Sequence, residues 1–296
     1  MRSVKIGRMK KPIPPASNLT TTARRLKRDI EVFRGWSENK KRYNPLLKRT
    51  AALKNSRMGR SLLIVANGPS SEKISRDSMR EWVASGGEVM GLNWAHLNPA
   101  LSEIPLTLYL SADRRMVEES DESHKLRHYL KTHKDLLAFV PEIRIMRWQE
   151  ILPGINFYVF CRFYIKYLRP PWWGLQPHYP KAFTSQTGLH ALQISTWLGY
   201  KAIYLVGFDN SYFREFTRTK GGGIVKEISH AGEGVQTHQS EIDTATYLEI
   251  QASLFRDYWK FSHKNIWNLD PHSPTDAFPK VDFSTVLKEL NQKLGK

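Results

Sequence analysis

The sequence predicts an α/β fold built on a mostly parallel sheet with helices on both faces. Two observations support this class. Short apolar runs typical of buried strands recur from residue 61 onward, and longer segments typical of helices separate them. The candidate strands are 61–66, 88–92, 106–110, 136–140, 201–206 and 265–269, and the candidate helices are 71–85, 114–133, 187–198, 240–262 and 283–294.

Residues 1–60 form a basic arm ahead of a catalytic domain predicted at 61–296. The arm holds 18 Lys or Arg and three acidic residues, whereas the rest of the chain holds 27 basic and 25 acidic residues. Residues 1–20 contain three prolines and no apolar period, so we expect them to be disordered. Helix is expected from Thr21 to about Ser56, because Leu26, Ile30, Phe33 and Trp36 recur at helical spacing.

The charge of the arm suits an anionic partner. We favour an anionic membrane surface over nucleic acid, because the folded body is almost neutral; a solvated arm without a partner is the third interpretation. No secretory signal and no membrane span is visible, which predicts a cytoplasmic protein, peripheral at the inner face of the cell membrane. Cys161, the single cysteine, is expected to be a small apolar filler. The oligomeric state stays open, a homo-oligomer included.

Two stretches depart from the alternation of strands and helices. Residues 157–182 are dense in aromatic side chains and are expected to form a helical excursion that ends at Pro170-Pro171. Residues 209–239 lack periodicity and contain Gly221-Gly222-Gly223, Gly232 and Gly234. A loop of this length after a strand end is typical of a mobile active-site lid.

The first candidate strand ends in Asn67-Gly68-Pro69-Ser70, which predicts a strand–turn–helix unit. Ligands bind at the carboxyl ends of strands in open α/β sheets. Gly68 allows close backbone approach, Pro69 fixes the turn, and Ser70 caps the helix while its first N–H groups face an anion. Asn67 adds an amide that can bind a base, sugar or phosphate. The alternative is a tight turn that binds no ligand.

A second unit runs from Thr184 to Asp209 as a polar loop, a helix, a stop at Gly199 and a buried strand. Thr184, Ser185 and Gly188 at the helix start predict a second turn that binds an anion or a sugar. Asp209 ends the strand, at the position where ligands are contacted. Helix capping by Ser185 or Thr187 is the structural alternative, and His190 is expected to be a packed residue.

Three segments together resemble the bacterial sialyltransferases of glycosyltransferase family 42: Asn-Gly-Pro-Ser at 67–70, Thr-Ser with a following Gly at 184–188, and Leu-Gly-Tyr-Lys-x-Ile-Tyr-Leu-x-Gly-x-Asp at 198–209. A related group, which includes flagellin-modifying transferases and archaeal 6-hydroxymethylpterin diphosphokinases, shares the first and third motifs. The resemblance covers residues 61–280 and implies a Rossmann-like fold of the GT-A variant type.

The resemblance also implies roles for single residues. Asn67 and Asn93 would hold the donor nucleotide, Ser185 and Gly188 would line the donor site, and Ser273 would contact the nucleotide at the last turn. Tyr212 resembles a lid tyrosine that stabilises the departing phosphate. His238, in the order lid, histidine, polar turn and helix, would be the general base.

The sequence thus predicts an inverting glycosyltransferase that moves a sugar from a nucleotide donor to a surface glycan or glycolipid. The resemblance favours a CMP-activated sialic or other nonulosonic acid as donor. No Asp-x-Asp occurs in the chain, so we expect neither a metal nor another cofactor. Histidine suits the general base at neutral pH, and His230 and His178 are the rivals of His238. An ATP-dependent diphosphotransferase that uses Mg²⁺ is the alternative, and a nucleic-acid-binding module is the third hypothesis.

Overall fold

The computed structural model describes residues 18–293 except 102, 134, 164–174, 182–185, 211–215, 219–223, 231–233, 241–243 and 263. The helices are α1 Asn18–Ala51, α2 Arg76–Ala84, α3 Asp121–Thr132, α4 Ile145–Ile151, α5 Thr187–Leu198, α6 Thr244–Tyr258 and α7 Phe283–Lys293. The strands are β1 Ser61–Val65, β2 Glu88–Leu92, β3 Leu108–Leu110, β4 Leu137–Pro141, β5 Phe157–Phe160, β6 Ala202–Val206, β7 Phe216–Arg218, β8 Ile224–His230, β9 Gly234–Ser240 and β10 Ile266–Asn268.

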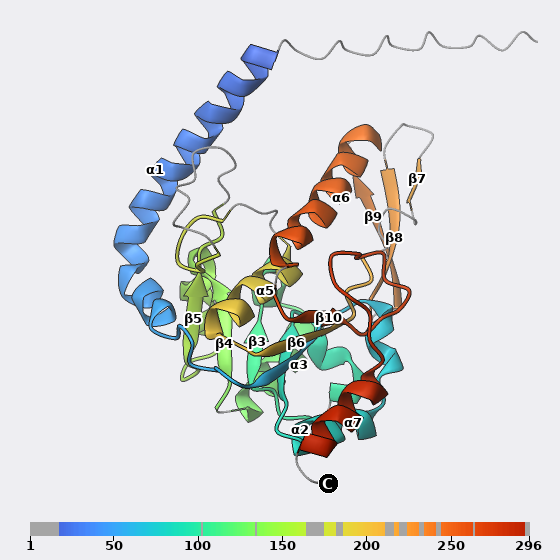
Figure 1. The fold of residues 1–296 in the computed structure, drawn as a ribbon. Coiled ribbons are helices and arrows are strands. Elements are labelled where there is room, and N and C mark those ends of the chain that lie inside the picture. Colours follow the sequence, from blue (N-terminus) through green and yellow to red (C-terminus); the bar gives the residue numbers. More distant parts are fainter. Residues whose placement is uncertain are drawn as a thin grey trace, which may run out of the picture.

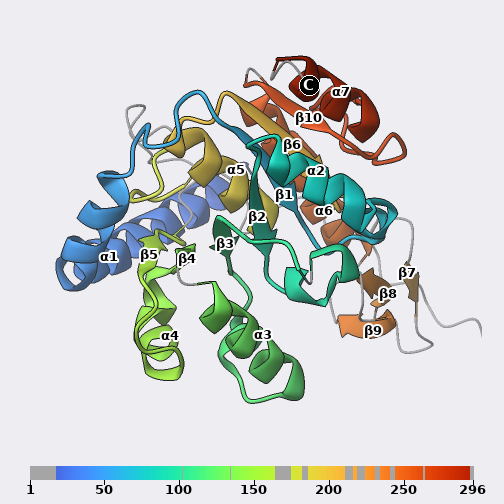
Figure 2. The same ribbon diagram turned by 90° about the horizontal axis from the view of Figure 1, so that it is seen from below.

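Seven strands form one parallel sheet in the order β10-β6-β1-β2-β3-β4-β5. Figure 2 shows these strands side by side, with β5 and β10 at the two ends of the row. The chain first adds strands outward from β1 to β5 and then returns to place β6 on the other side of β1. This arrangement confirms the predicted Rossmann-like α/β class.

The sheet separates two apolar cores because successive strand residues point to opposite faces. In β1, Leu63 and Val65 join the core that also holds residues of α2, α3, α4 and α7, whereas Leu62 and Ile64 join the core that holds residues of α5 and α6. Helices therefore cover both faces, and the buried strands read as nearly continuous apolar runs.

Helix α1 covers the β5 edge of the sheet (Figures 1 and 2). Tyr43 and Leu47 of this helix are buried in the core, and the N–H of Val159 in β5 donates to the hydroxyl of Thr50 at 3.0 Å. The C-terminal half of α1 is therefore part of the folded body, whereas the boundary at residue 60 stays a prediction. Residues 1–17, expected to be disordered, lie outside the described part, and residues 18–20 belong to α1.

The structure corrects three expectations about single segments. Residues 157–160 form β5 instead of a helical excursion, because they extend the sheet beside β4. Residues 209–239 contain β7, β8 and β9, which pair as an antiparallel sheet, instead of being structureless. The helix expected from 240 begins at Thr244, because residues up to Ser240 pair with β8. Figures 1 and 2 both place this small sheet on the side of the molecule opposite α1.

No helix among the described residues is long and apolar enough to cross a membrane. Cys161 is fully buried, as expected for an apolar filler, and packs with Trp36 of α1.

Candidate functional site

A pocket lies at the point where the strand order reverses, between the carboxyl ends of β1 and β6. This is the position at which open α/β sheets bind ligands. The pocket has a volume of about 120 Å³ and opens to solvent. Among the described residues, those that line it are Ala66, Asn67, Gly68, Pro69, Leu92, Asn93, Gln186, Thr187, Gly188, Gly207, Phe208, Asp209, Asn210 and Tyr258. The structure thus brings together the two turns that the sequence singled out.

The turn after β1 is fastened to the turn after β6. The N–H of Gly68 donates to the carbonyl of Gly207 at 3.0 Å, and the N–H of Gly207 donates to the hydroxyl of Ser70 at 3.1 Å. The N–H and the hydroxyl of Ser70 both donate to Oδ2 of Asp209, at 3.1 Å each. The expectation that Ser70 caps the following helix is wrong, because its hydroxyl bonds to the other turn. The N–H of Ser70, which we expected to face a bound anion, donates to the carboxyl group of Asp209 instead.

Gly68 and Gly207 are required by this contact between the two turns. A Cβ on Gly68 would lie 1.8 Å from Oδ2 of Asp209 and 2.5 Å from the carbonyl oxygen of Gly207. Gly207 has a φ of 75°, and a Cβ there would lie 2.4 Å from the carbonyl oxygen of Ala66. Gly68 therefore makes room for the partner turn. It also lines the pocket, and its predicted approach to a ligand stays a prediction.

The carboxyl group of Asp209 is held inside this junction. Burial raises its pKa above the usual value for aspartate, the hydrogen bonds from Ser70 lower it, and the nearby carboxyl of Asp270 raises it again. In the described structure the carboxyl group of Asp209 accepts hydrogen bonds from Ser70 and lies beside the carboxyl of Asp270, and Asp209 also lines the pocket. We therefore assign Asp209 first to the junction, and its predicted ligand contact stays a prediction.

Asn93 connects three elements at the rim of the pocket. Its Nδ2 donates to the hydroxyl of Thr187 at the start of α5, at 3.0 Å. Its Oδ1 accepts from the N–H groups of Ala112 and Asp113 after β3, at 3.1 and 3.4 Å. Its φ of 44° lies in the left-handed region, which asparagine tolerates better than most residues. The amide of Asn93 is therefore occupied by the protein.

Asn67 differs from Asn93 in one respect that matters for binding. It lines the pocket directly after β1, and its Oδ1 is enclosed without a hydrogen-bond partner in the described part of the chain. A buried amide oxygen without a partner costs roughly 1–3 kcal/mol. A ligand that donates a hydrogen bond to this atom would remove that cost.

The start of α5 forms the opposite wall of the pocket. Gly188 lines it, and a Cβ there would lie 2.6 Å from the ring of Phe208, so this glycine lets the helix pack against the turn after β6. Gln186 precedes the helix as its N-cap residue, and its side chain makes no cap hydrogen bond. The first N–H groups of α5 therefore supply partial positive charge to this wall.

A network of amides and hydroxyls that the sequence did not reveal closes the back of the pocket. The hydroxyl of Tyr258 donates to Oε1 of Gln186 at 2.6 Å, and Nε2 of Gln186 donates to Oδ1 of Asn210 at 2.8 Å. Nδ2 of Asn210 donates to Tyr258 and to the hydroxyl of Thr275, at 3.2 and 3.0 Å. The only signal in the sequence is that Gln186 and Asn210 adjoin the two predicted motifs.

The remaining predicted residues are not assembled at the pocket by the described structure. Ser273 is buried and does not line it; its hydroxyl donates to the carbonyl of Phe208 at 2.8 Å, which ties the turn after β10 to the turn after β6. Its predicted contact with the nucleotide stays a prediction. Thr184, Ser185 and Tyr212 lie outside the described residues.

His238 lies in β9 and pairs with Lys226 of β8, so it belongs to a strand and not to a loop between a lid and a helix. His230 is the last residue of β8 and pairs with Gly234. The third candidate base, His178, packs on the ring of Trp197 with 5.4 Å between centroids. Burial, reinforced by Lys40, lowers the pKa of His178 to about 4, which makes it a poor base at neutral pH.

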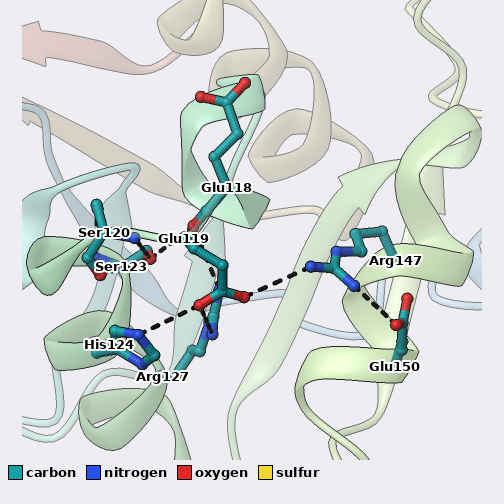
Figure 3. A network of polar contacts seen from close by, with 8 residues as sticks. All are labelled: Glu118, Glu119, Ser120, Ser123, His124, Arg127, Arg147 and Glu150. Atoms are coloured by element: carbon teal, nitrogen blue, oxygen red, sulfur yellow. Dashed lines mark hydrogen bonds and ion pairs between the residues drawn. The ribbon is translucent and has the colours of Figure 1, made fainter.

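Polar clusters also lie outside the pocket. On the surface, the carboxylate of Glu119 meets His124, Arg127 and Arg147, at 3.2, 3.1 and 3.5 Å, and Arg147 also pairs with Glu150 (Figure 3). These ion pairs connect α3 to α4 and stabilise the fold by little, because most of their members are exposed.

The second cluster is buried under α5. Nζ of Lys181 lies 2.5 Å from Nε2 of His190, and both residues are buried. His190 is thus a packed residue, as expected. Within the described ranges, no group of three or more His, Cys, Asp or Glu side chains could hold a metal ion.

A comparison with solved structures gives distant neighbours, one of which is a glycosyltransferase. No protein-family model matches the chain, and no curated protein matches it. The structure of the MAf glycosyltransferase from Magnetospirillum magneticum AMB-1 aligns with 13% identity and a TM-score of 0.45. The alignment covers 85% of this chain and 41% of that chain. The chain therefore spans less than half the length of that protein.

Proposed function

We propose that this chain is a glycosyltransferase that binds the nucleotide of its donor in the pocket between β1 and β6. The observation that carries the proposal is the side chain of Asn67: this residue lines the pocket, and its buried Oδ1 has no hydrogen-bond partner among the described residues. A ribose hydroxyl or the amino group of a base would donate a hydrogen bond to this atom. A nucleotide supplies both groups.

The charge of the pocket favours a donor with few phosphates. None of the described residues that line it is Lys or Arg, and Asp209 adds an acidic group. A triphosphate in this pocket would require cations to balance its charge. One phosphate can be held by the first N–H groups of α5 and by neighbouring hydroxyls. We therefore prefer a CMP-activated donor, with a sialic or other nonulosonic acid as the sugar, over ATP.

The proposed reaction inverts the anomeric centre. A general base accepts the proton of an acceptor hydroxyl while that oxygen bonds to the anomeric carbon, and CMP leaves with the electron pair of the broken C–O bond. We assign His238 as this base and β7, β8 and β9 as the lid that carries it; Tyr212 and Ser185 are proposed to contact the leaving phosphate and the donor. The acceptor is a surface glycan or a glycolipid.

A nucleotide panel tests the donor class. Thermal unfolding is measured with CMP, UDP, GDP and ATP, each with and without Mg²⁺. A ligand present at 100 times its Kd stabilises the folded protein by about 2.7 kcal/mol. We expect CMP to stabilise without Mg²⁺. Stabilisation by ATP only with Mg²⁺ would replace the proposal with the diphosphotransferase, and no stabilisation by any nucleotide would contradict both.

Replacement of His238 tests the base. His238→Ala should lower turnover by about 10²- to 10⁴-fold, the usual range for a general base. CMP affinity should change little, because the base acts on the acceptor. His230→Ala is the matched control, since it removes a histidine from the neighbouring strand of the same small sheet. Loss of turnover in the His230 variant alone would move the role to that residue.

A further inference from the structure

The N-terminal half of α1 carries an apolar stripe made of Leu26, Ile30 and Phe33. Each of these side chains is 41% exposed, although all three are large and apolar. Their spacing of four and three residues places them on one side of the helix. Figure 1 shows this half of α1 extending past the end of β5, away from the sheet. A contiguous row of exposed apolar side chains on a helix is a candidate interaction surface.

A row of cations runs beside the apolar stripe. Lys27, Arg34 and Lys41 are exposed and recur every seven residues, so they lie on one side of the helix next to the stripe. Glu31 and Glu38 follow two of these cations at a distance of four residues and offset part of their charge. The helix nevertheless belongs to a segment, residues 1–60, that holds 18 basic and three acidic residues.

We propose that this face of α1 binds the surface of a membrane that contains anionic lipids. The apolar side chains would enter the boundary between headgroups and acyl chains, and the cations beside them would contact the lipid phosphates. Nucleic acid would be contacted by the cations alone and would leave the apolar stripe in water. The proposal is independent of the reaction that the pocket catalyses.

The C-terminal half of α1 is buried against the body, and this limits how the proposal can be tested. Trp36, Tyr43, Leu47 and Thr50, in the C-terminal half, are buried against the body. Deletion of residues 1–60 would therefore remove part of the core and could not separate membrane binding from folding. Substitution of exposed side chains in the full chain keeps these buried residues. Phe33 also packs on the ring of Trp36, with 5.5 Å between centroids, so the double variant Leu26→Ser, Ile30→Ser serves as a second test that keeps this contact.

The test is co-sedimentation of the full chain with phosphatidylcholine vesicles that do or do not contain phosphatidylglycerol. The test variant combines Leu26→Ser, Ile30→Ser and Phe33→Ser. The control combines Met146→Ser, Leu248→Ser and Trp259→Ser, three apolar residues outside α1 that are 58%, 43% and 51% exposed. Circular dichroism and thermal unfolding verify that both variants are folded.

We expect the wild type and the control to sediment with the anionic vesicles, less so at high salt, and the stripe variant to lose about tenfold or more of its partitioning. Equal sedimentation of the stripe variant and the wild type would overturn the proposal. So would equal binding of the wild type to vesicles without phosphatidylglycerol. A wild type that dimerises through the stripe in light scattering and ignores both vesicles would assign the face to a second copy of the chain instead.

Discussion

Asn67 and Asn93 follow the neighbouring strands β1 and β2, and both line the same pocket. The amide of Asn93 is occupied on both sides, by Thr187 and by the N–H groups of Ala112 and Asp113. The Oδ1 of Asn67 has no such partner in the described structure. Asn93, after β2, thus holds elements of the pocket wall together. Asn67, after β1, keeps an amide oxygen without such a bond. Two residues of one type, predicted for one role, therefore differ in their bonding: the side chain of Asn93 joins elements around the pocket, and we propose Asn67 as the residue that binds the nucleotide.

The largest effect is expected where the turn after β1 meets the turn after β6. Gly68→Ala places a methyl group against the carboxylate of Asp209 and the carbonyl of Gly207, so we expect a loss of about 3 kcal/mol or more of unfolding free energy. Chemical denaturation measures it. Gly35→Ala in α1 is the control, because its nearest atom would be an ordinary 3.6 Å away. A Gly68→Ala variant as stable as that control would show that the two turns are not rigidly joined.

Removal of the Asn93 amide should cost less stability. Asn93→Ala loses hydrogen bonds to α5 and to the segment after β3, and it places alanine at a positive φ, so we expect about 2–3 kcal/mol. Asn93→Gly retains the backbone conformation without strain and isolates the contribution of the amide. If Asn93→Ala left stability intact and only weakened nucleotide binding, Asn93 would be a binding residue after all.

His96, which follows β2, should have a smaller effect on the free energy of unfolding, and this effect depends on pH. Burial lowers its pKa from 6.5 to about 4 in the folded protein, so the unfolded chain binds a proton first as pH falls. The stability that it contributes is present above pH 6.5 and is lost between pH 6.5 and about 4. For a partly exposed ring, about 1–2 kcal/mol is expected. The curve of unfolding free energy against pH should flatten in His96→Gln, and an unchanged curve would exclude His96 as its source.

The fold was predictable where the apolar pattern is simple. Leu62–Val65 and Ile203–Val206 are buried on both faces, so their sequences read as continuous apolar runs. β5 escaped detection because Phe157–Phe160 begins a longer aromatic stretch whose composition conceals where the strand ends. β7, β8 and β9 were not predicted, because the glycines between them interrupt the alternation of apolar and polar residues that is typical of a strand.

The candidate site was predictable where it follows directly from a strand end. Asn67, Asn93 and Asp209 are found at the pocket because parallel strands end at one edge of a sheet. The contact of Tyr258 with Gln186 could not be foreseen, because 72 residues separate them in the chain. The sequence also does not show that the N–H of Ser70 donates a hydrogen bond to Asp209, because this bond depends on how closely the turns after β1 and β6 approach each other.

The most direct measurement is a calorimetric titration of CMP into the wild type, Asn67→Ala and Asn93→Gly. Asn67→Ala should be at least as stable as the wild type, by up to about 1–3 kcal/mol, because it removes a buried oxygen that has no partner in the described structure. Its CMP affinity should fall about tenfold or more, as expected for a lost hydrogen bond in an enclosed pocket. Asn93→Gly should lose more stability and less affinity. An Asn67→Ala variant that binds CMP as tightly as the wild type would contradict a nucleotide site between β1 and β6.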